Sequence, residues 1–219
     1  MLQFINVSKR YLDSGEVLSN ISFRLEQGEM AFLTGHSGAG KSTMLKLIPL
    51  IERPTRGQVL FEGKPINHLP KRQVPYLRRK LGLIFQDYRL LHDRTVFDNV
   101  ALPLQIAGYG QQETARRVRA ALDKVGLLRK EKRYPLALSG GEQQRVGIAR
   151  AIVHKPSLIL ADEPTGNLDP ELSAEIMELF REFNQVGVTL LIASHNLDLI
   201  SRFACRNLKL HQGRLVEGG

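Results

Sequence analysis

Apolar residues recur along the chain in short uninterrupted runs, which predict strands that are covered on both faces. Four such runs lie at residues 30–34, 81–86, 157–163 and 188–194. The run at 188–194 is the last strand that the pattern predicts. Runs of this kind are typical of an open parallel sheet, in which ligands lie beyond the carboxyl ends of the strands.

Shorter strands surround the first of these runs and are joined by turn-forming residues. The predicted strands are residues 4–7, 21–25 and 57–61, and the predicted turns are residues 13–16, 27–29, 54–57 and 62–65. The strands follow one another closely in the sequence. This favours a small antiparallel sheet attached to the parallel one.

Helical periodicity dominates residues 93–149, with breaks at residues 108–110 and at Gly126. Further helices are predicted at residues 142–153 and 171–183. We therefore expect one domain over residues 1–219. In it, residues 1–86 and 155–219 form an α/β core with the antiparallel subdomain, and residues 87–154 form a mainly helical insertion.

A glycine-rich segment follows the first apolar run and matches the phosphate-loop pattern G-x-x-x-x-G-K-[ST]. It comprises Gly35, His36, Ser37, Gly38, Ala39, Gly40, Lys41, Ser42 and Thr43. A helix is predicted from Ser42 to Ile48, because Pro49 lacks an N–H group and disfavours helical geometry before it. With a strand before it and a helix after it, the loop predicts binding of a nucleoside triphosphate rather than a turn without a ligand. Lys41 would reach the β- and γ-phosphates, and the Ser42 hydroxyl would ligate Mg²⁺.

Composition narrows the class of protein. The 219 residues carry a formal net charge of +9 and a single cysteine, Cys205. One cysteine allows no intramolecular disulfide, which fits a reducing compartment. The sequence contains no signal-peptide pattern and no apolar run long enough to cross a membrane. The positive charge is concentrated in residues 71–80 and 116–133, which are either solvated helix faces or surfaces beside anionic lipid. No aromatic residues interleave with these bases, so binding of single-stranded nucleic acid is disfavoured.

Polar residues stand at the ends of the predicted buried strands. Gln86 ends one strand, as a solvated terminus or as a group facing a metal ion. Asp162 and Glu163 end another, and they should face different groups because side chains alternate along a strand. Asp162 suits the Mg²⁺ shell, and Glu163 could polarise an attacking water. His195 follows the last predicted strand, so it is expected at the same edge.

Two further segments admit either a structural or a binding role. Ser139, Gly140 and Gly141 open a predicted helix, where Ser139 is an ordinary N-cap or part of an anion site. Tyr11 is a half-buried core aromatic or a ring that stacks on adenine.

Taken together, the segments resemble an ABC-type ATPase subunit over the whole chain. The phosphate loop, Gln86, the string Leu-Ser-Gly-Gly-Glu-Gln at residues 138–143, the Asp162-Glu163 pair, Asn-Leu-Asp at 167–169 and His195 occur in that family's order. The resemblance implies a RecA-like P-loop NTPase fold with an ABC nucleotide-binding domain, and hydrolysis of ATP with Mg²⁺.

The resemblance also implies a head-to-tail ATP sandwich of two subunits. Ser139 and Gly141 of one subunit would close on the phosphate held by Lys41 of the other. Glu163 would be the general base, and His195 would stabilise the transferring phosphate. Tyr11 and Asp169 fall where the family contacts the nucleotide, and Ser42, Gln86 and Asp162 where it holds the metal ion.

Residues 28–43 and 85–100 resemble more closely the cell-division ATP-binding subunits of bacteria. This likeness implies an FtsX-like integral membrane partner and a peripheral position on the cytoplasmic face of the inner membrane. The partner would dock near Gln86, at the apolar residues Tyr88, Leu90 and Leu91, for which a core role stays open.

Two other functions remain open. One is the ATPase of a lipoprotein-release or macrolide-export transporter, and the other is a nucleic-acid-associated ABC protein. The chain also departs from the family at Leu50, near which a glycine is common, and nothing functional is carried over beyond Ser201.

Overall fold

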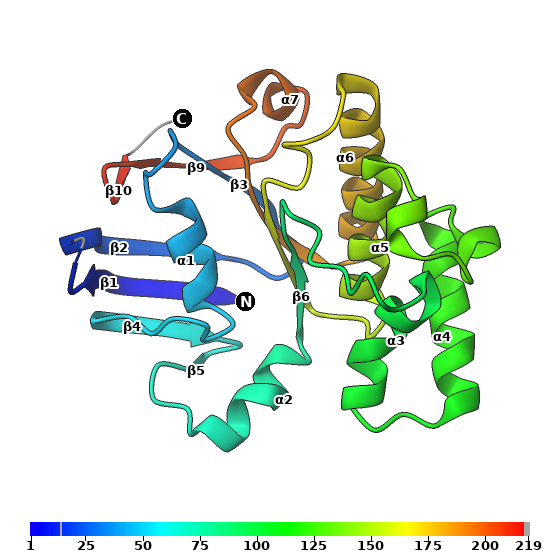
Figure 1. Ribbon diagram of the computed structural model, residues 1–219. Helices are drawn as coiled ribbons and strands as arrows, with labels where there is room; N and C mark the ends of the chain where they lie inside the picture. Colours follow the sequence, from blue (N-terminus) through cyan, green and yellow to red (C-terminus); the bar gives the residue numbers. More distant parts are fainter. Residues whose placement is uncertain (14, 217–219) are drawn as a thin grey trace.

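The computed structural model describes residues 1–13 and 15–216, apart from the side chain of Leu199, and contains two sheets (Figure 1). The larger one has six strands in the order β10-β9-β3-β8-β7-β6. Its strands are β3 (Met30–Thr34), β6 (Leu81–Ile84), β7 (Leu158–Asp162), β8 (Thr189–Ala193), β9 (Arg206–His211) and β10 (Arg214–Val216). All neighbours in it are parallel except β10, which pairs antiparallel with β9. The carboxyl ends of five strands therefore meet at one edge.

Alternation along the buried strands divides the core into two parts. Phe32 faces one cluster, and its neighbours Ala31 and Leu33 face the other. The first cluster packs under α3 (Val96–Ile106), α4 (Gln111–Lys124), α5 (Gly140–Ile152) and α6 (Pro170–Gln185). The second packs under α1 (Lys41–Leu47) and the antiparallel sheet. Figure 1 shows these two layers on opposite sides of the large sheet.

The predicted antiparallel sheet is present, with the strand order β2-β1-β4-β5. Its strands are β1 (Leu2–Tyr11), β2 (Gly15–Leu25), β4 (Arg56–Phe61) and β5 (Lys64–Pro65). Leu2 pairs with Leu25 on one side and with Phe61 on the other, and all three side chains are buried. The turn predicted at residues 13–16 includes Ser14, which lies outside the described residues.

Hydrogen-bonded caps define where α3, α5 and α6 begin. Thr95 at α3 and Ser139 at α5 each form a capping box, with Asp98 and Glu142 respectively, and the Asp169 carboxylate caps α6. The helices predicted at residues 142–153 and 171–183 are both found, and α5 begins two residues earlier than expected, directly after its cap. Two short α-helices, α2 (Val74–Arg78) and α7 (Leu197–Ser201), are also present in the described part of the chain.

A strand that the sequence analysis did not predict lies beyond β8, the last of the fully buried strands. This strand is β9, and it pairs with β3 directly. In β9 only Leu208 and Leu210 are buried, between exposed or half-buried polar residues. This short half-buried alternation lacks the continuous apolar run by which the other strands were recognised.

The docking role considered for Leu90 is also wrong, because its side chain is buried within the helical core. Tyr88 packs partly buried against the same core. Of the three apolar residues expected to contact a partner, Leu91 is the one that is exposed.

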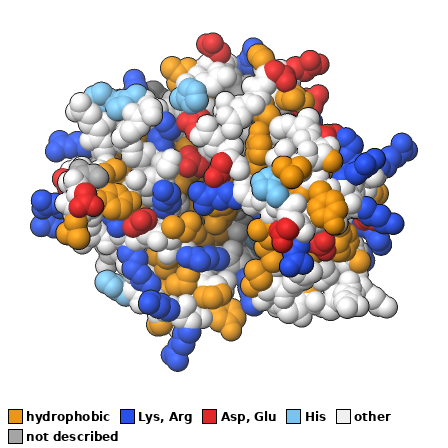
Figure 2. Space-filling view, viewed as in Figure 1, with side chains coloured by type: hydrophobic (Ala, Val, Ile, Leu, Met, Phe, Trp, Pro, Cys, Tyr) orange, Lys and Arg blue, Asp and Glu red, His pale blue; other side chains and the backbone are white. Residues whose placement is uncertain are grey.

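Six of the thirteen bases in the two positive stretches form ion pairs with carboxylates of the described residues. The pairs are Arg116 and Arg117 with Glu113, Arg119 with Glu131, Lys124 with Glu182, Lys130 with Glu142, and Lys80 with Glu62. Acidic side chains lie among the basic ones on the face shown in Figure 2. These contacts support the interpretation as solvated helix faces. Within the described residues, no helix has the length and apolar character that crossing a membrane requires.

Helix α1 ends as predicted before Pro49, and the chain then turns at Leu50, whose φ is +53°. Glycine adopts this left-handed geometry freely, whereas another residue loses roughly 1–2 kcal/mol in it. The Leu50 side chain is buried, so its packing offsets the strained backbone. The leucine therefore keeps the same type of helix end that a glycine would give.

This balance predicts an unusual order of stability for two variants. Leu50→Ala and Leu50→Gly both lose the buried side chain, at about 2–5 kcal/mol. Leu50→Gly also removes the strain, so it is expected to be about 1 kcal/mol more stable than Leu50→Ala. Urea unfolding of the two variants measures the difference. An alanine variant as stable as the glycine variant would show that the backbone at Leu50 is unstrained.

Candidate active site

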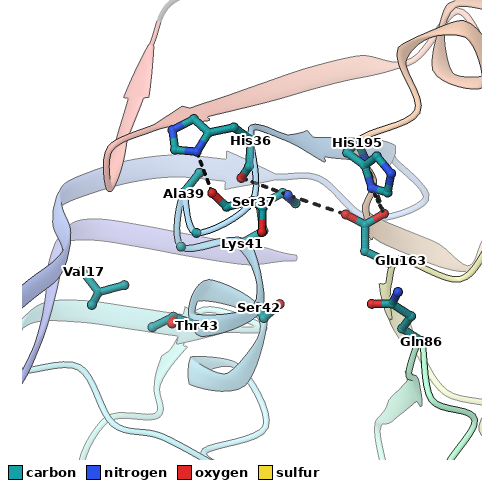
Figure 3. A pocket seen from close by; sticks show the side chains of 12 residues that line it. Val17, His36, Ser37, Ala39, Lys41, Ser42, Thr43, Gln86, Glu163 and His195 are labelled. Carbon is teal, nitrogen blue, oxygen red and sulfur yellow. Dashed lines mark hydrogen bonds and ion pairs between the residues drawn. The ribbon is translucent and has the colours of Figure 1, made fainter. Parts of the chain in front are cut away.

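An open cavity of about 680 Å³ lies at the carboxyl edge of the six-stranded sheet (Figure 3). Its lining consists of Val17, His36, Ser37, Gly38, Ala39, Gly40, Lys41, Ser42, Thr43, Gln86, Glu163 and His195. The structure thus brings together the loop after β3 and single residues that follow β6, β7 and β8. These are residues that the sequence placed at strand ends.

The loop between β3 and α1 curls where only glycine fits. Gly35 has a φ of +152°, and a Cβ on it would lie 2.3 Å from the Leu210 carbonyl oxygen. Gly40 has a φ of +107° and precedes α1 without any side-chain cap. The first N–H groups of α1 are thus left without a side-chain acceptor, as an anion-binding loop requires.

Lys41 is held under this loop with its ammonium group directed toward the cavity. Its Nζ donates to the carbonyl oxygens of Gly35 at 2.7 Å and His36 at 3.3 Å, and it lies 3.5 Å from Glu163 Oε1. The residue is only 8 % exposed. The charged partner of this nearly buried ammonium group in the structure is Glu163, and a phosphate group that enters the cavity can take the same role.

Glu163 lies between two basic groups. One carboxylate oxygen faces Lys41, and the other lies 2.9 Å from His195 Nδ1. Its φ of +47° turns the chain just after β7, and its N–H donates to Ala193 of β8. This kink directs the carboxylate into the cavity, where it can accept a proton from a bound molecule.

Asp162, the last residue of β7, faces a different group from its neighbour, as alternation predicts. It lies beside Ser42, and its buried Oδ1 atom has no hydrogen-bond partner. Burial raises the pKa of the Asp162 carboxyl above its ordinary value, although a hydrogen bond from Ser42 acts in the opposite direction. An unsatisfied buried carboxylate oxygen next to a hydroxyl fits a hard divalent cation.

Gln86 is followed by a strained segment that α5 holds in place. Tyr88 and Arg89 both have positive φ, of +55° and +48°. The Arg150 guanidinium, in the last turn of α5, donates to their carbonyl oxygens at 2.7 and 2.6 Å. Asn167 also donates to the carbonyl oxygen of Gln86. These contacts fix where the Gln86 side chain enters the cavity.

Several residues expected at the site lie elsewhere. Tyr11 does not line the cavity, and its half-buried ring lies 4.7 Å from Lys9 Nζ. Ser139, Gly140 and Gly141 stand at the start of α5, and Asp169 caps the neighbouring α6. A Cβ on Gly141 would lie 2.9 Å from Leu172 of α6, so these two helix starts pack together.

One lining residue escaped the sequence analysis. Val17 lies on β2, which was predicted to begin only at Ile21. Buried and exposed residues alternate only from Ile21 onward, because the buried Leu18 and Ile21 are three residues apart, so the pattern gave no signal for the start of β2.

Proteins whose parallel sheet presents such a phosphate loop at its carboxyl edge are P-loop nucleoside triphosphatases, and this chain is one of them. A family profile described as ABC transporter matches residues 18–166. The chain therefore belongs to the ABC transporter family, and it binds and hydrolyses ATP. The family and fold predicted from the sequence are confirmed.

Proteins of known name extend this likeness over the full chain. The sequence is 60% identical to the cell division ATP-binding protein FtsE of Escherichia coli K12, over 100% of this chain and 98% of that protein. It is 54% identical to the protein of the same name in Haemophilus influenzae, over 98% and 99% of the two chains. The dimeric structure of MJ0796, a bacterial ABC transporter cassette, is 35% identical, with a TM-score of 0.91 over 99% of this chain and 97% of that one. A post-hydrolysis dimer of the same cassette holds ADP and Pi, with a TM-score of 0.90 over the same shares.

Proposed function

We propose that this chain is the ATP-hydrolysing subunit of a membrane complex in bacterial cell division, working with an FtsX-like integral membrane protein. The observation that carries the proposal is the 60% identity, over the whole chain, to a protein named for cell division. The chain would act as a single ATP-binding domain at the cytoplasmic face of the plasma membrane, with residues 87–154 as its helical part. The alternatives are the ATPase of a lipoprotein-release or macrolide-export transporter and a nucleic-acid-associated ABC protein.

In this proposal each residue of the cavity has a separate role in phosphoryl transfer to water. Lys41 binds the phosphates, Glu163 accepts the proton of the attacking water, and His195 donates to the transferring phosphate. Ser42, Gln86 and Asp162 would hold Mg²⁺. When bound, this ion neutralises charge that develops on the phosphates.

A second copy of the chain would complete the site. Ser139, Gly140, Gly141 and Asp169 lie apart from the cavity of their own subunit, although the helix start at Ser139 suits an anion. The related cassette MJ0796 is described as a dimer. We therefore propose a head-to-tail sandwich in which Ser139 and Gly141 face ATP held by the other subunit. Tyr11 would reach the adenine only if its ring leaves Lys9.

The membrane partner would dock in an apolar cleft of about 650 Å³ between α2 and α3. The cleft is lined by Pro75, Arg78, Arg79, Leu102, Pro103, Ile106, Ala107, Gly108, Tyr109 and His154. Arg78 and Arg79 donate to backbone carbonyl groups, and neither forms an ion pair with a described carboxylate. A short amphipathic helix with acidic residues fits both the apolar lining and these cations.

Purification of the tagged chain from bacterial membranes in detergent tests the proposal. An FtsX-like protein is expected to co-purify in high salt, because an apolar contact is not screened as lipid attraction is. Ile106→Glu should lose the partner and keep ATP binding. Val186→Glu, at another exposed apolar residue directly after α6, should keep both. Recovery of a lipoprotein or macrolide permease would favour the alternative, and no integral protein in high salt would contradict the docking.

A further inference from the structure

The turn between β9 and β10 contacts the phosphate loop, although it lies far from it in the sequence. The N–H of Gly213 donates to the carbonyl oxygen of Ala39 at 3.2 Å. The carbonyl oxygen of Gly213 accepts from the N–H of Ser19, on β2, at 2.8 Å. One residue of the turn is thus bonded to the phosphate loop on one side and to the cavity wall on the other.

Packing around these hydrogen bonds leaves no room for a side chain. A Cβ on Gly213, whose φ is +74°, would lie 2.4 Å from the carbonyl oxygen of Val17. On the other side, Gly35 meets the carbonyl oxygen of Leu210, and Gly40 lies against Leu18 and Leu210. The phosphate loop, β2 and the β9–β10 hairpin are therefore in backbone contact. A shift of the hairpin must move the loop.

A pair of histidine rings forms a further contact between the hairpin and the loop. The rings of His36, in the loop, and His211, at the end of β9, meet edge to face with centroids 5.5 Å apart. His36 Nδ1 also lies 2.7 Å from the carbonyl oxygen of Ser37 and donates to it. His211 falls at this edge because β9 runs parallel to β3. No other aromatic ring contact of the described residues involves the phosphate loop.

We propose that the β9–β10 hairpin is a positioning element of the ATP site. Gly213 and His211 hold the phosphate loop in the shape that accepts the phosphates, and neither residue touches ATP itself. The conformational entropy of the loop is thereby lost during folding and not when ATP binds. The affinity for ATP is higher as a result. The proposal concerns ATP binding, and it does not depend on the membrane partner or on cell division.

A second turn of the same geometry provides a matched control. Glu62 and Gly63, between β4 and β5, have φ values of +52° and +73°, against +45° and +74° for Gln212 and Gly213. A Cβ on Gly63 would meet no atom within 4 Å. Gly63→Ala therefore strains the backbone as Gly213→Ala does, but it displaces nothing.

The two alanine variants separate positioning from stability. Both are expected to lower the melting temperature. Gly213→Ala should in addition raise KM for ATP about tenfold, equivalent to about 1.4 kcal/mol, with a smaller change in kcat. Gly63→Ala should leave KM as in the wild type. Equal KM values for the two variants would overturn the proposal.

The histidine pair provides an independent measurement, which decides the matter if Gly213→Ala does not fold. His211→Ala is expected to weaken ATP binding several-fold in calorimetric titrations, because His36 loses its neighbour. His211→Phe keeps a ring edge at this position and should restore most of the affinity. Affinities of both variants equal to that of the wild type would contradict the positioning role of the hairpin.

Discussion

Glu163→Gln is expected to lower the rate of ATP hydrolysis by at least about 100-fold while ATP still binds. The amide has the size of the carboxylate and can keep a hydrogen bond to His195, but it cannot take a proton from water. The contacts of Lys41 with Gly35 and His36 do not involve Glu163 and should survive. Phosphate release and calorimetric titration with ATP measure the two effects separately.

A matched control for this variant is Glu171→Gln, which changes an exposed glutamate in the first turn of α6. It removes the same charge at a distance from the cavity, so its turnover should equal that of the wild type. Wild-type turnover in Glu163→Gln would remove Glu163 from the catalytic role. Loss of ATP binding in that variant would show that the carboxylate organises the binding site instead.

A mixing experiment has the second large expected effect. Ser139→Arg alone should lose hydrolysis, because a bulky cation blocks the closure of two subunits. Lys41→Ala alone should lose it because ATP binds poorly. In a mixed dimer one site lacks both residues and the other has both, so the mixture should recover activity. Random pairing limits the recovery to about a quarter of the wild-type rate.

Loss of the helix cap has to be separated from loss of the interface. Ser139→Arg removes a cap, which costs about 0.5–2 kcal/mol of stability. Thr95→Arg removes the same type of capping box at α3. The Thr95 variant should lose similar stability and keep its activity. A mixture of the Ser139 and Lys41 variants that stays inactive at saturating ATP would contradict the sandwich.

The sequence was sufficient to predict elements that carry a strong local signal. Continuous apolar runs marked β3, β7 and β8, since both faces of these strands are covered. Residues that set the ends of helices were recognisable from the local sequence as well. Ser139 caps α5 as its spacing to Glu142 suggests, and Pro49 follows the end of α1.

Features that depend on distant residues could not be predicted. β9 is buried on one face only, and its place beside β3 comes from the topology of the sheet. The meeting of His36 and His211 follows from that pairing. Leu90 looks like a surface residue after a strand end, yet the inserted helices cover it. No local sequence signal, such as a glycine or an asparagine, predicts the positive φ of Glu163.

Helix α5 carries two contacts that belong to different neighbours. Its first residue follows Ser139, which would face the proposed second subunit. Arg150, in its last turn, donates hydrogen bonds to the backbone carbonyl groups of Tyr88 and Arg89, just beyond Gln86. A helix of this length is a rod of about 20 Å that resists bending. Pushing on one end therefore displaces the other. In the proposed sandwich, α5 would connect the cavity that Gln86 enters with the cavity of the second copy, so closure of one cavity would change the free energy of closing the other.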